Sequence, residues 1–142
     1  MSHFTKNKGT FVTSIESFVK ACGKLGLKGK LQTGGQIRMY DGTMVPVKAA
    51  FVTGQYALGL QEEEEGKYSL CGDIWGVKRD LYDSTSPLKN MGDQDLMNKV
   101  LQETTKITIE DTYAEQGFVC ETVEDKQTGG IELTLTRNTV QW

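Results

Sequence analysis

The sequence predicts an α+β fold, a two-layer sandwich in which a mainly antiparallel sheet carries two helical segments on one face. Short strand-like segments follow one another with turn residues between them, which is typical of antiparallel hairpins. Two longer segments have apolar residues at helical spacing on one side only, so each is expected to pack against the sheet. No linker or internal repeat divides the 142 residues, and a single domain over residues 1–142 is expected.

The first strand and the first helix are predicted near the start of the chain. Gly9–Val12 contains the β-branched and aromatic residues typical of a strand. Thr13 and Glu16 have the spacing of a capping box, so Thr13 is expected to cap a helix. Gly26 can adopt the left-handed conformation that ends it. The apolar residues of this helix share one face: Ile15, Phe18, Val19, Cys22 and Leu25.

The middle of the chain predicts a series of hairpins. Residues 28–36 are rich in Gly and Lys and are expected to form a loop. Asp41 and Gly42 then predict a two-residue type I′ turn. Pro46 cannot donate a backbone hydrogen bond, so its strand is expected at a sheet edge or a bulge. Three more strands are predicted, at residues 47–53, 56–60 and 67–75.

The second helix is predicted after a loop at residues 79–94, with Asp93 or Asp95 as its N-cap. The β-branched residues between Thr104 and Ile109 lower helix propensity, so we expect a kink or break there. The helix would resume to about Gln116 and stop at Gly117. Two strands, at residues 118–124 and 131–137, predict a final hairpin with one buried face.

Charge and hydropathy exclude several classes of protein. The 16 basic and 19 acidic residues give a net charge of -3, so nucleic-acid binding is not expected. No apolar stretch approaches the roughly 20 residues that cross a bilayer, and no apolar run follows Lys6 and Lys8 as a signal peptide requires. A soluble cytoplasmic protein without membrane contact is expected.

The three cysteines, Cys22, Cys71 and Cys120, are too widely spaced for a paired metal motif, and their odd number does not suit a disulfide framework. A reducing compartment is therefore expected. Each cysteine falls on a predicted apolar face, which favours packed side chains over reactive thiols.

Several stretches resemble a known family in the same order along the chain. They are Met-Ser-His-Phe at the start, GDIWGVKRDLY from Gly72 to Tyr82, residues 96–118, and GIELTLTR from Gly130 to Arg137. Together they resemble the domain-of-unknown-function family twelve fifty-seven, which includes the hypothetical chloroplast reading frame thirty-five of red-algal plastids and cyanobacteria. The chain would be a divergent member. The resemblance implies a small soluble α+β protein, adds the plastid stroma or a viral equivalent as compartments, and implies no established activity.

The only histidine, His3, is a weak candidate for chemistry. In third position it could bind copper or nickel together with the amino group and two amides. However, the small Ser2 favours removal of Met1, which would shift the histidine to second place, so a structural position in the first strand is favoured. His3 is kept among the candidate binding residues.

No catalytic set or cofactor motif emerges from the remaining residues. The glycine pairs at positions 34–35 and 129–130 lack the neighbours of a P-loop or a dinucleotide site, so no cofactor is expected. The carboxylates of Glu62–Glu65 could attract a divalent cation, but successive side chains point in different directions. We interpret this run as a solvated turn that discourages pairing between sheet edges.

The segment around Trp75 is the strongest candidate for a binding surface. It places Trp75, Lys78, Arg79 and Tyr82 within eight residues. Aromatic and arginine side chains carry much of the energy at protein interfaces, and they also stack on single-stranded bases. Core packing would explain the two aromatic residues equally well. The negative net charge favours a protein partner over nucleic acid.

Three functions remain open from the sequence. The preferred one is a non-enzymatic protein-binding or assembly module that uses Gly72–Tyr82 as its contact surface. The second is a small metal-dependent enzyme that uses His3 with carboxylates such as Asp73, Asp80 or Glu103. The third is a structural subunit that self-associates through strand edges.

Overall fold

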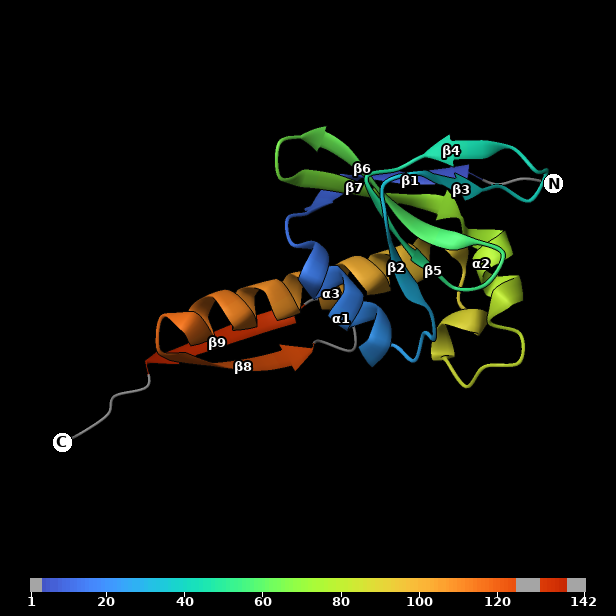
Figure 1. Ribbon diagram of the computed structural model, residues 1–142. Helices are drawn as coiled ribbons and strands as arrows, with labels where there is room; N and C mark the ends of the chain where they lie inside the picture. Colours follow the sequence, from blue (N-terminus) through green and yellow to red (C-terminus); the bar gives the residue numbers. More distant parts are fainter. Residues whose placement is uncertain (1–3, 125–130, 138–142) are drawn as a thin grey trace.

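The computed structural model describes residues 4–124 and 131–137, and a five-stranded antiparallel sheet lies at its centre (Figure 1). The strand order is β1-β7-β6-β5-β2. The bounds are Phe4–Val12 for β1, Lys30–Thr33 for β2, Ala49–Val52 for β5, Ala57–Glu64 for β6 and Lys67–Asp73 for β7. The helices α1 (Ile15–Lys24) and α3 (Asp93–Glu115) lie on one face of the sheet, so the predicted α+β class is confirmed.

Two small ribbons complete the arrangement. The hairpin of β3 (Gln36–Arg38) and β4 (Met44–Pro46) lies over the sheet face opposite the helices. The hairpin of β8 (Phe118–Glu124) and β9 (Ile131–Arg137) packs on α3, on the side that faces away from the sheet (Figure 1). The predicted final hairpin is thus confirmed, while its connecting residues 125–130 lie outside the described residues.

Alternation along the strands buries both faces of the sheet. On β6, Leu58 and Leu60 point to the helices, whereas Ala57 points to the β3–β4 ribbon. The helix-side cluster contains large side chains, among them Phe18, Phe51 and Met97. The ribbon-side cluster is smaller and contains Ile37, Val47, Ala50, Ala57 and Cys71. The sheet is therefore an inner layer, covered by helices on one side and by the β3–β4 ribbon on the other.

Ser14, not the predicted Thr13, caps α1. The Ser14 hydroxyl accepts a hydrogen bond from the backbone N–H of Ser17 at 3.1 Å. A cap must directly precede the first helical residue, and that residue is Ile15, so the cap lies one position later than predicted. The predicted end of the helix is confirmed, since Gly26 follows it with φ of 81°.

Residues 28–36 are not simply a loop, because Lys30–Thr33 forms the edge strand β2. It pairs antiparallel with β5, from Lys30 opposite Val52 to Thr33 opposite Ala49. This strand depends on long-range pairing, which its Gly- and Lys-rich composition does not signal. Gly29 permits the close approach at its start, since a Cβ there would lie 2.1 Å from the carbonyl oxygen of Val52.

The predicted type I′ turn at Asp41 and Gly42 is also wrong. That turn needs positive φ at both residues, and among the described residues only glycines have positive φ. Instead Gly42, with φ of 90°, donates its N–H to the Met39 carbonyl at 2.9 Å. Met39 in turn donates to the Thr43 carbonyl at 2.8 Å, so the hairpin has a three-residue loop that ends in a left-handed glycine.

A third helix, α2 (Ile74–Asp80), replaces the end of the strand predicted at residues 67–75 and the start of the loop predicted at residues 79–94. The strand β7 ends at Asp73, whose carboxylate accepts the N–H of Gly76 at 3.1 Å and caps α2. The signal was the capping aspartate followed by buried Ile74, Val77 and Leu81 at steps of three and four. A short 3-10 helix, η1 (Pro87–Asn90), lies within the other part of the predicted loop.

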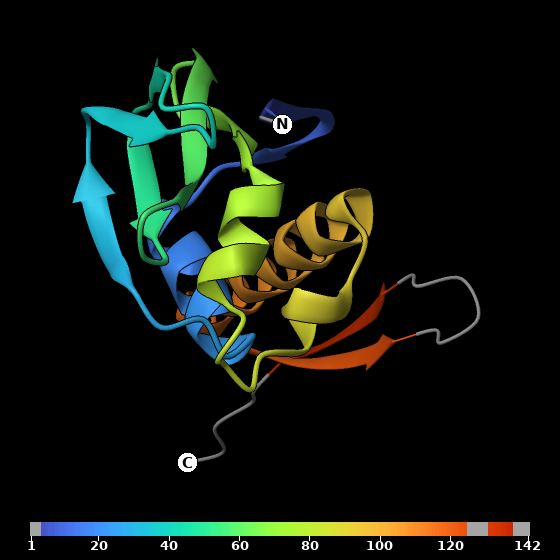
Figure 2. The ribbon, with the colours of Figure 1, turned by 90° about the vertical axis from the view of Figure 1, so that its right-hand side faces the viewer.

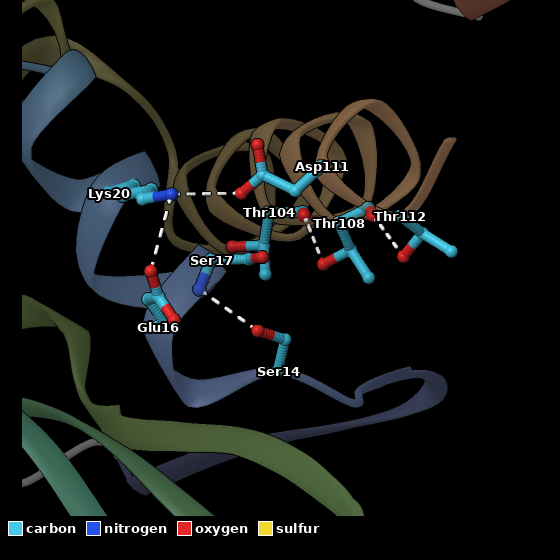
Figure 3. Close-up of polar contacts among 8 residues, drawn as sticks. All are labelled: Ser14, Glu16, Ser17, Lys20, Thr104, Thr108, Asp111 and Thr112. Carbon is cyan, nitrogen blue, oxygen red and sulfur yellow. Dashed lines mark hydrogen bonds and ion pairs between the residues drawn. The ribbon is translucent and has the colours of Figure 1, made fainter. Parts of the chain in front are cut away.

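The helix α3 is a single 23-residue element, so the predicted break at residues 104–109 is wrong. Thr104, Thr108 and Thr112 each donate a hydroxyl hydrogen bond to the carbonyl four residues earlier, at 2.7, 2.8 and 2.7 Å. Figure 3 shows the bonds of Thr108 and Thr112. These bonds satisfy the hydroxyl groups within the helix. Gly92 is the N-cap in place of Asp93 or Asp95, and Gly117 follows the helix with φ of 84°, as predicted.

Polar contacts join α1 to α3 at the surface. The ammonium group of Lys20 on α1 lies 2.9 Å from the Asp111 carboxylate on α3 and 3.4 Å from Glu16 (Figure 3). The hydrogen bonds that Lys20 donates to the carboxylates of Asp111 and Glu16 raise the pKa of Lys20. Beneath this exposed pair, Ser17 and Thr104 are buried. The two helices thus combine a buried interface with an ion pair at its rim.

The close approach of the β3–β4 ribbon to the sheet depends on Gly59. A Cβ at this position would lie 2.8 Å from Val47 Cγ1 and 2.9 Å from Ile37 Cδ1. We therefore expect Gly59→Ala to lower the free energy of unfolding by about 1–3 kcal/mol, measured by urea denaturation. The matched control is Gly23→Ala on α1, where a Cβ meets nothing within 4 Å. It should raise stability by up to about 1 kcal/mol, and equal stability of the two variants would contradict the packing argument.

Candidate functional site

Four of the five binding residues proposed from the sequence lie around one surface groove. We call it the α2 groove; it is an open cavity of about 680 Å³ lined by Trp75, Lys78, Arg79, Tyr82, Asp83 and Lys89. The first three belong to α2, and Tyr82 follows its end. Figure 2 shows α2 in front of the sheet, with η1 beside it. The fifth predicted residue, His3, lies outside the described residues.

The groove exposes one side of α2 while the other side anchors the helix. Ile74 and Val77 are fully buried in the helix-side core, and Leu81 is nearly so. Trp75 is 37% exposed and Tyr82 is 79% exposed. Core packing therefore does not explain Tyr82, and it explains Trp75 only in part. Because the exposed residues recur at steps of three and four, they form one stripe along the helix.

Arg79 is held between aromatic rings at the side of the groove. Its guanidinium carbon lies 5.6 Å from the ring centroids of both Tyr40 and Trp75. One guanidinium N–H also donates to the Tyr40 hydroxyl at 3.1 Å. Tyr40 and Trp75 meet edge to face, with centroids 4.4 Å apart. These contacts fix the plane and position of the guanidinium group at the surface.

The buried carboxylate of Asp73 brings Tyr40 to this place. Asp73 is fully buried, and besides capping α2 at Gly76 it accepts the backbone N–H of Tyr40 at 2.7 Å. Tyr40 belongs to the loop between β3 and β4, which is 33 residues away in sequence. One side chain thus starts the helix and places an aromatic ring beside it.

Asp80 performs the corresponding role at the other end of α2. Its carboxylate accepts hydrogen bonds from the Thr53 hydroxyl at 2.7 Å and from the N–H groups of Gln55 and Tyr56 at 3.2 and 2.9 Å. The turn before β6 is therefore bound to the helix. Close packing requires Gly76, because a Cβ there would lie 2.5 Å from the Tyr56 ring.

A second, smaller cavity adjoins the α2 groove across Arg79. It has a volume of about 310 Å³ and is lined by Tyr40, Gln55, Tyr56, Arg79 and Asp80. Arg79 is thus the residue that both cavities share. The contributions of Tyr40 and Tyr56 could not be seen in the sequence, since only the folded chain brings these residues to α2.

The groove carries an excess of positive charge. Lys78 pairs with Asp93 at 2.6 Å and donates to the Met91 carbonyl at 3.3 Å. Lys89 donates to the Ser84 carbonyl at 2.8 Å. Among residues 4–117, neither Arg79 nor Lys89 forms an ion pair with a carboxylate. A groove with three cations and one lining acid, Asp83, therefore lies on a chain of net charge -3.

The carboxylates considered for catalysis are engaged elsewhere. Asp73 and Asp80 accept hydrogen bonds from neighbouring backbone, as described above, and Glu103 on α3 pairs with Lys24 on α1 at 3.8 Å. The acidic run Glu62–Glu65 is not a turn as predicted, because its first three residues belong to β6. There Glu63 pairs with Lys6, and Glu64 lies 3.6 Å from Lys67. Over the described part of the chain, no group of three or more His, Cys, Asp or Glu side chains is placed to hold a metal ion.

Two of the three cysteines are buried, as the sequence indicated. Cys22 packs in the helix-side core and Cys71 in the ribbon-side cluster. Burial raises the pKa of Cys71 to about 12, and burial also raises the pKa of Cys22. Cys120 belongs to β8, and its side chain lies outside what the structure describes.

Comparison with protein-family models, with curated proteins and with solved structures finds no match to this chain. The resemblance to the domain-of-unknown-function family therefore stays a prediction. Among the residues that the structure describes, none of the helices combines the length and the apolar character that crossing a membrane requires.

Removal of the Asp80 carboxylate should loosen the turn before β6. Asp80→Ala would leave the donors on Thr53, Gln55 and Tyr56 without their acceptor. We expect the free energy of unfolding to fall by about 1–3 kcal/mol in denaturant unfolding. The control is Asp83→Ala, which removes an exposed acid of the groove and should change stability by less than about 0.5 kcal/mol. Equal losses in both variants would contradict the anchoring role.

The buried thiols should resist alkylation in the folded protein. At pH 8, iodoacetamide should modify Cys22 and Cys71 far more slowly in the native state than in urea, because both burial and a raised pKa suppress the thiolate. Peptide mass spectrometry resolves the two sites. Rapid native modification of either cysteine would show that its surroundings are open to solvent.

Proposed function

We propose that this chain is a non-enzymatic binding or assembly module that contacts a protein partner through the α2 groove. The observation that carries the proposal is the convergence of Trp75, Lys78, Arg79 and Tyr82 on one exposed groove. Side chains of these types supply much of the energy at protein interfaces. The module would act in the cytoplasm or an equivalent compartment, as a divergent member of the family that the sequence resembles.

The rigidity of the groove supports this proposal. Arg79 is already fixed by two rings and a hydrogen bond, and α2 is tied down at both ends by Asp73 and Asp80. Side chains that are ordered before binding lose less conformational entropy when a partner arrives. A preorganised arginine beside exposed aromatic rings is the arrangement that interface hot spots use.

A partner protein suits the groove better than a nucleic acid. The groove is positive, but the chain as a whole has a net charge of -3, which repels a long phosphate backbone. A protein segment needs to match only the local charge of the groove. The aromatic side chains can then pack on apolar groups of the partner.

Self-association through a sheet edge is a second candidate, favoured by one observation on β2. This strand is at the edge of the five-stranded sheet, and its Leu31 is 46% exposed. Edge strands with exposed apolar residues can pair with another copy. Light scattering over a concentration series tests this candidate, and Leu31→Lys should abolish any concentration-dependent growth in mass.

The main proposal predicts that partner capture depends on the groove. The double variant Trp75→Ala/Arg79→Ala should lose at least about nine-tenths of the partner captured from a lysate of the native source, quantified by mass spectrometry. Tyr82→Ala should also weaken capture, and its 79% exposure means that it should leave the melting temperature unchanged.

The matched control is Phe11→Ala/Arg38→Ala. It removes an exposed aromatic residue of β1 and an exposed arginine of β3, both outside the groove. Capture by this control should equal that of the wild type. If the groove variants capture as much partner as the wild type does, the α2 groove is not the contact surface.

A further inference from the structure

The dimensions of the α2 groove indicate the conformation of the segment that it can bind. Seven residues separate Trp75, in the first turn of α2, from Tyr82, which lies beyond the last helical residue, Asp80; at the helical rise this separation is about 10 Å along the axis, with Lys78 and Arg79 between them. In a polyproline II segment, three residues advance about 9 Å and complete one turn. Residues i and i+3 of such a segment therefore point to the same side, at nearly the axial separation of residues 75 and 82.

The charge of the groove indicates which residues the bound segment has between its positions i and i+3. Lys78 is neutralised by Asp93, whereas Arg79 and Lys89 have no carboxylate partner within the described residues. Asp83, the one acid in the lining, forms no ion pair with either cation among the described residues, so both can be complemented by carboxylates at positions i+1 and i+2. Charge complementarity thus selects an acidic ligand for a groove on an otherwise acidic protein.

The position of Arg79 suits recognition of a carboxylate. Its plane is held by the rings of Tyr40 and Trp75, and one of its N–H groups is used by the Tyr40 hydroxyl. A guanidinium group has five N–H donors in a planar fork that matches the two oxygens of a carboxylate. Arg79 is exposed and lines the α2 groove, so a ligand in this groove can reach the guanidinium group.

We propose that the α2 groove binds a segment of a partner protein of the form Φ-[Asp/Glu]-[Asp/Glu]-Φ, where Φ is an aromatic or large aliphatic residue. The outer residues pack on Trp75 and Tyr82, and the acidic pair contacts Arg79 and Lys89. This inference rests on the proposed function and specifies the chemistry of its partner.

The test uses three synthetic peptides with the cores Phe-Glu-Glu-Phe, Phe-Gln-Gln-Phe and Phe-Glu-Phe, each flanked by Gly and Ser. Binding is followed by NMR titration of the ¹⁵N-labelled full chain, with the Trp75 indole signal assigned through Trp75→Phe. The first peptide should bind about tenfold more tightly than the glutamine peptide, and the advantage should shrink as salt rises. The shortened peptide should also bind more weakly, because its two rings no longer match the groove.

Variants assign the selectivity to particular residues. In Arg79→Gln the preference for glutamate over glutamine should fall to about twofold or less. Tyr82→Ala should lower the affinity for the Phe-Glu-Glu-Phe peptide, whereas the matched control Phe11→Ala should bind this peptide as tightly as the wild type does. Equal affinity for the glutamate and glutamine peptides, or an unchanged preference in Arg79→Gln, would overturn the proposal. Binding of oligothymidylate more tightly than the first peptide would overturn it in favour of nucleic acid.

The results also separate this inference from the proposed function. If partner capture depends on Trp75 and Arg79 but the acidic peptide does not bind, the function stands and this ligand chemistry is wrong. If the peptide binds as described but capture by the groove variants is undiminished, the ligand chemistry stands and the function assigned to the groove is wrong.

Discussion

The buried carboxylate of Asp73 is the constraint on which the surface around α2 depends. It lies at the end of β7, begins α2 through Gly76, and holds the β3–β4 loop through the N–H of Tyr40. A buried acceptor with two fixed donors allows little freedom to any of these parts. Arg79 and its aromatic neighbours take their positions from this junction, so a polar group in the core determines the geometry of an exposed surface.

Local sequence patterns were sufficient for the elements that local forces specify. The apolar face of α1 is a periodic signal, and the structure packs it into the helix-side core. The strand β2 has no such signal, because it forms by pairing with β5. In α3, propensity alone predicts a break, but bonds from threonine hydroxyls to the preceding turn and the buried face of the helix outweigh it.

The residues of the candidate site likewise fall into two groups, those that are close together in sequence and those that only the fold brings together. Trp75, Lys78, Arg79 and Tyr82 are close in sequence, so their grouping could be recognised without a structure. Tyr40 could not, since it reaches α2 across a separation that only the folded chain closes. The seven-residue α2 itself was missed because it follows β7 directly and has only about two turns. Short helices carry too few apolar repeats for periodicity to separate them from strands.

The two sides of α3 serve different neighbours. Its buried residues, from Leu96 to Ile107, pack toward the sheet, while the β8–β9 ribbon lies against the outer side (Figure 1). The β8–β9 ribbon therefore contacts the rest of the protein chiefly through the helix α3. Evolutionary drift in the ribbon can proceed with little effect on the Asp73 junction, so related chains should differ most in this outlying part and least around α2.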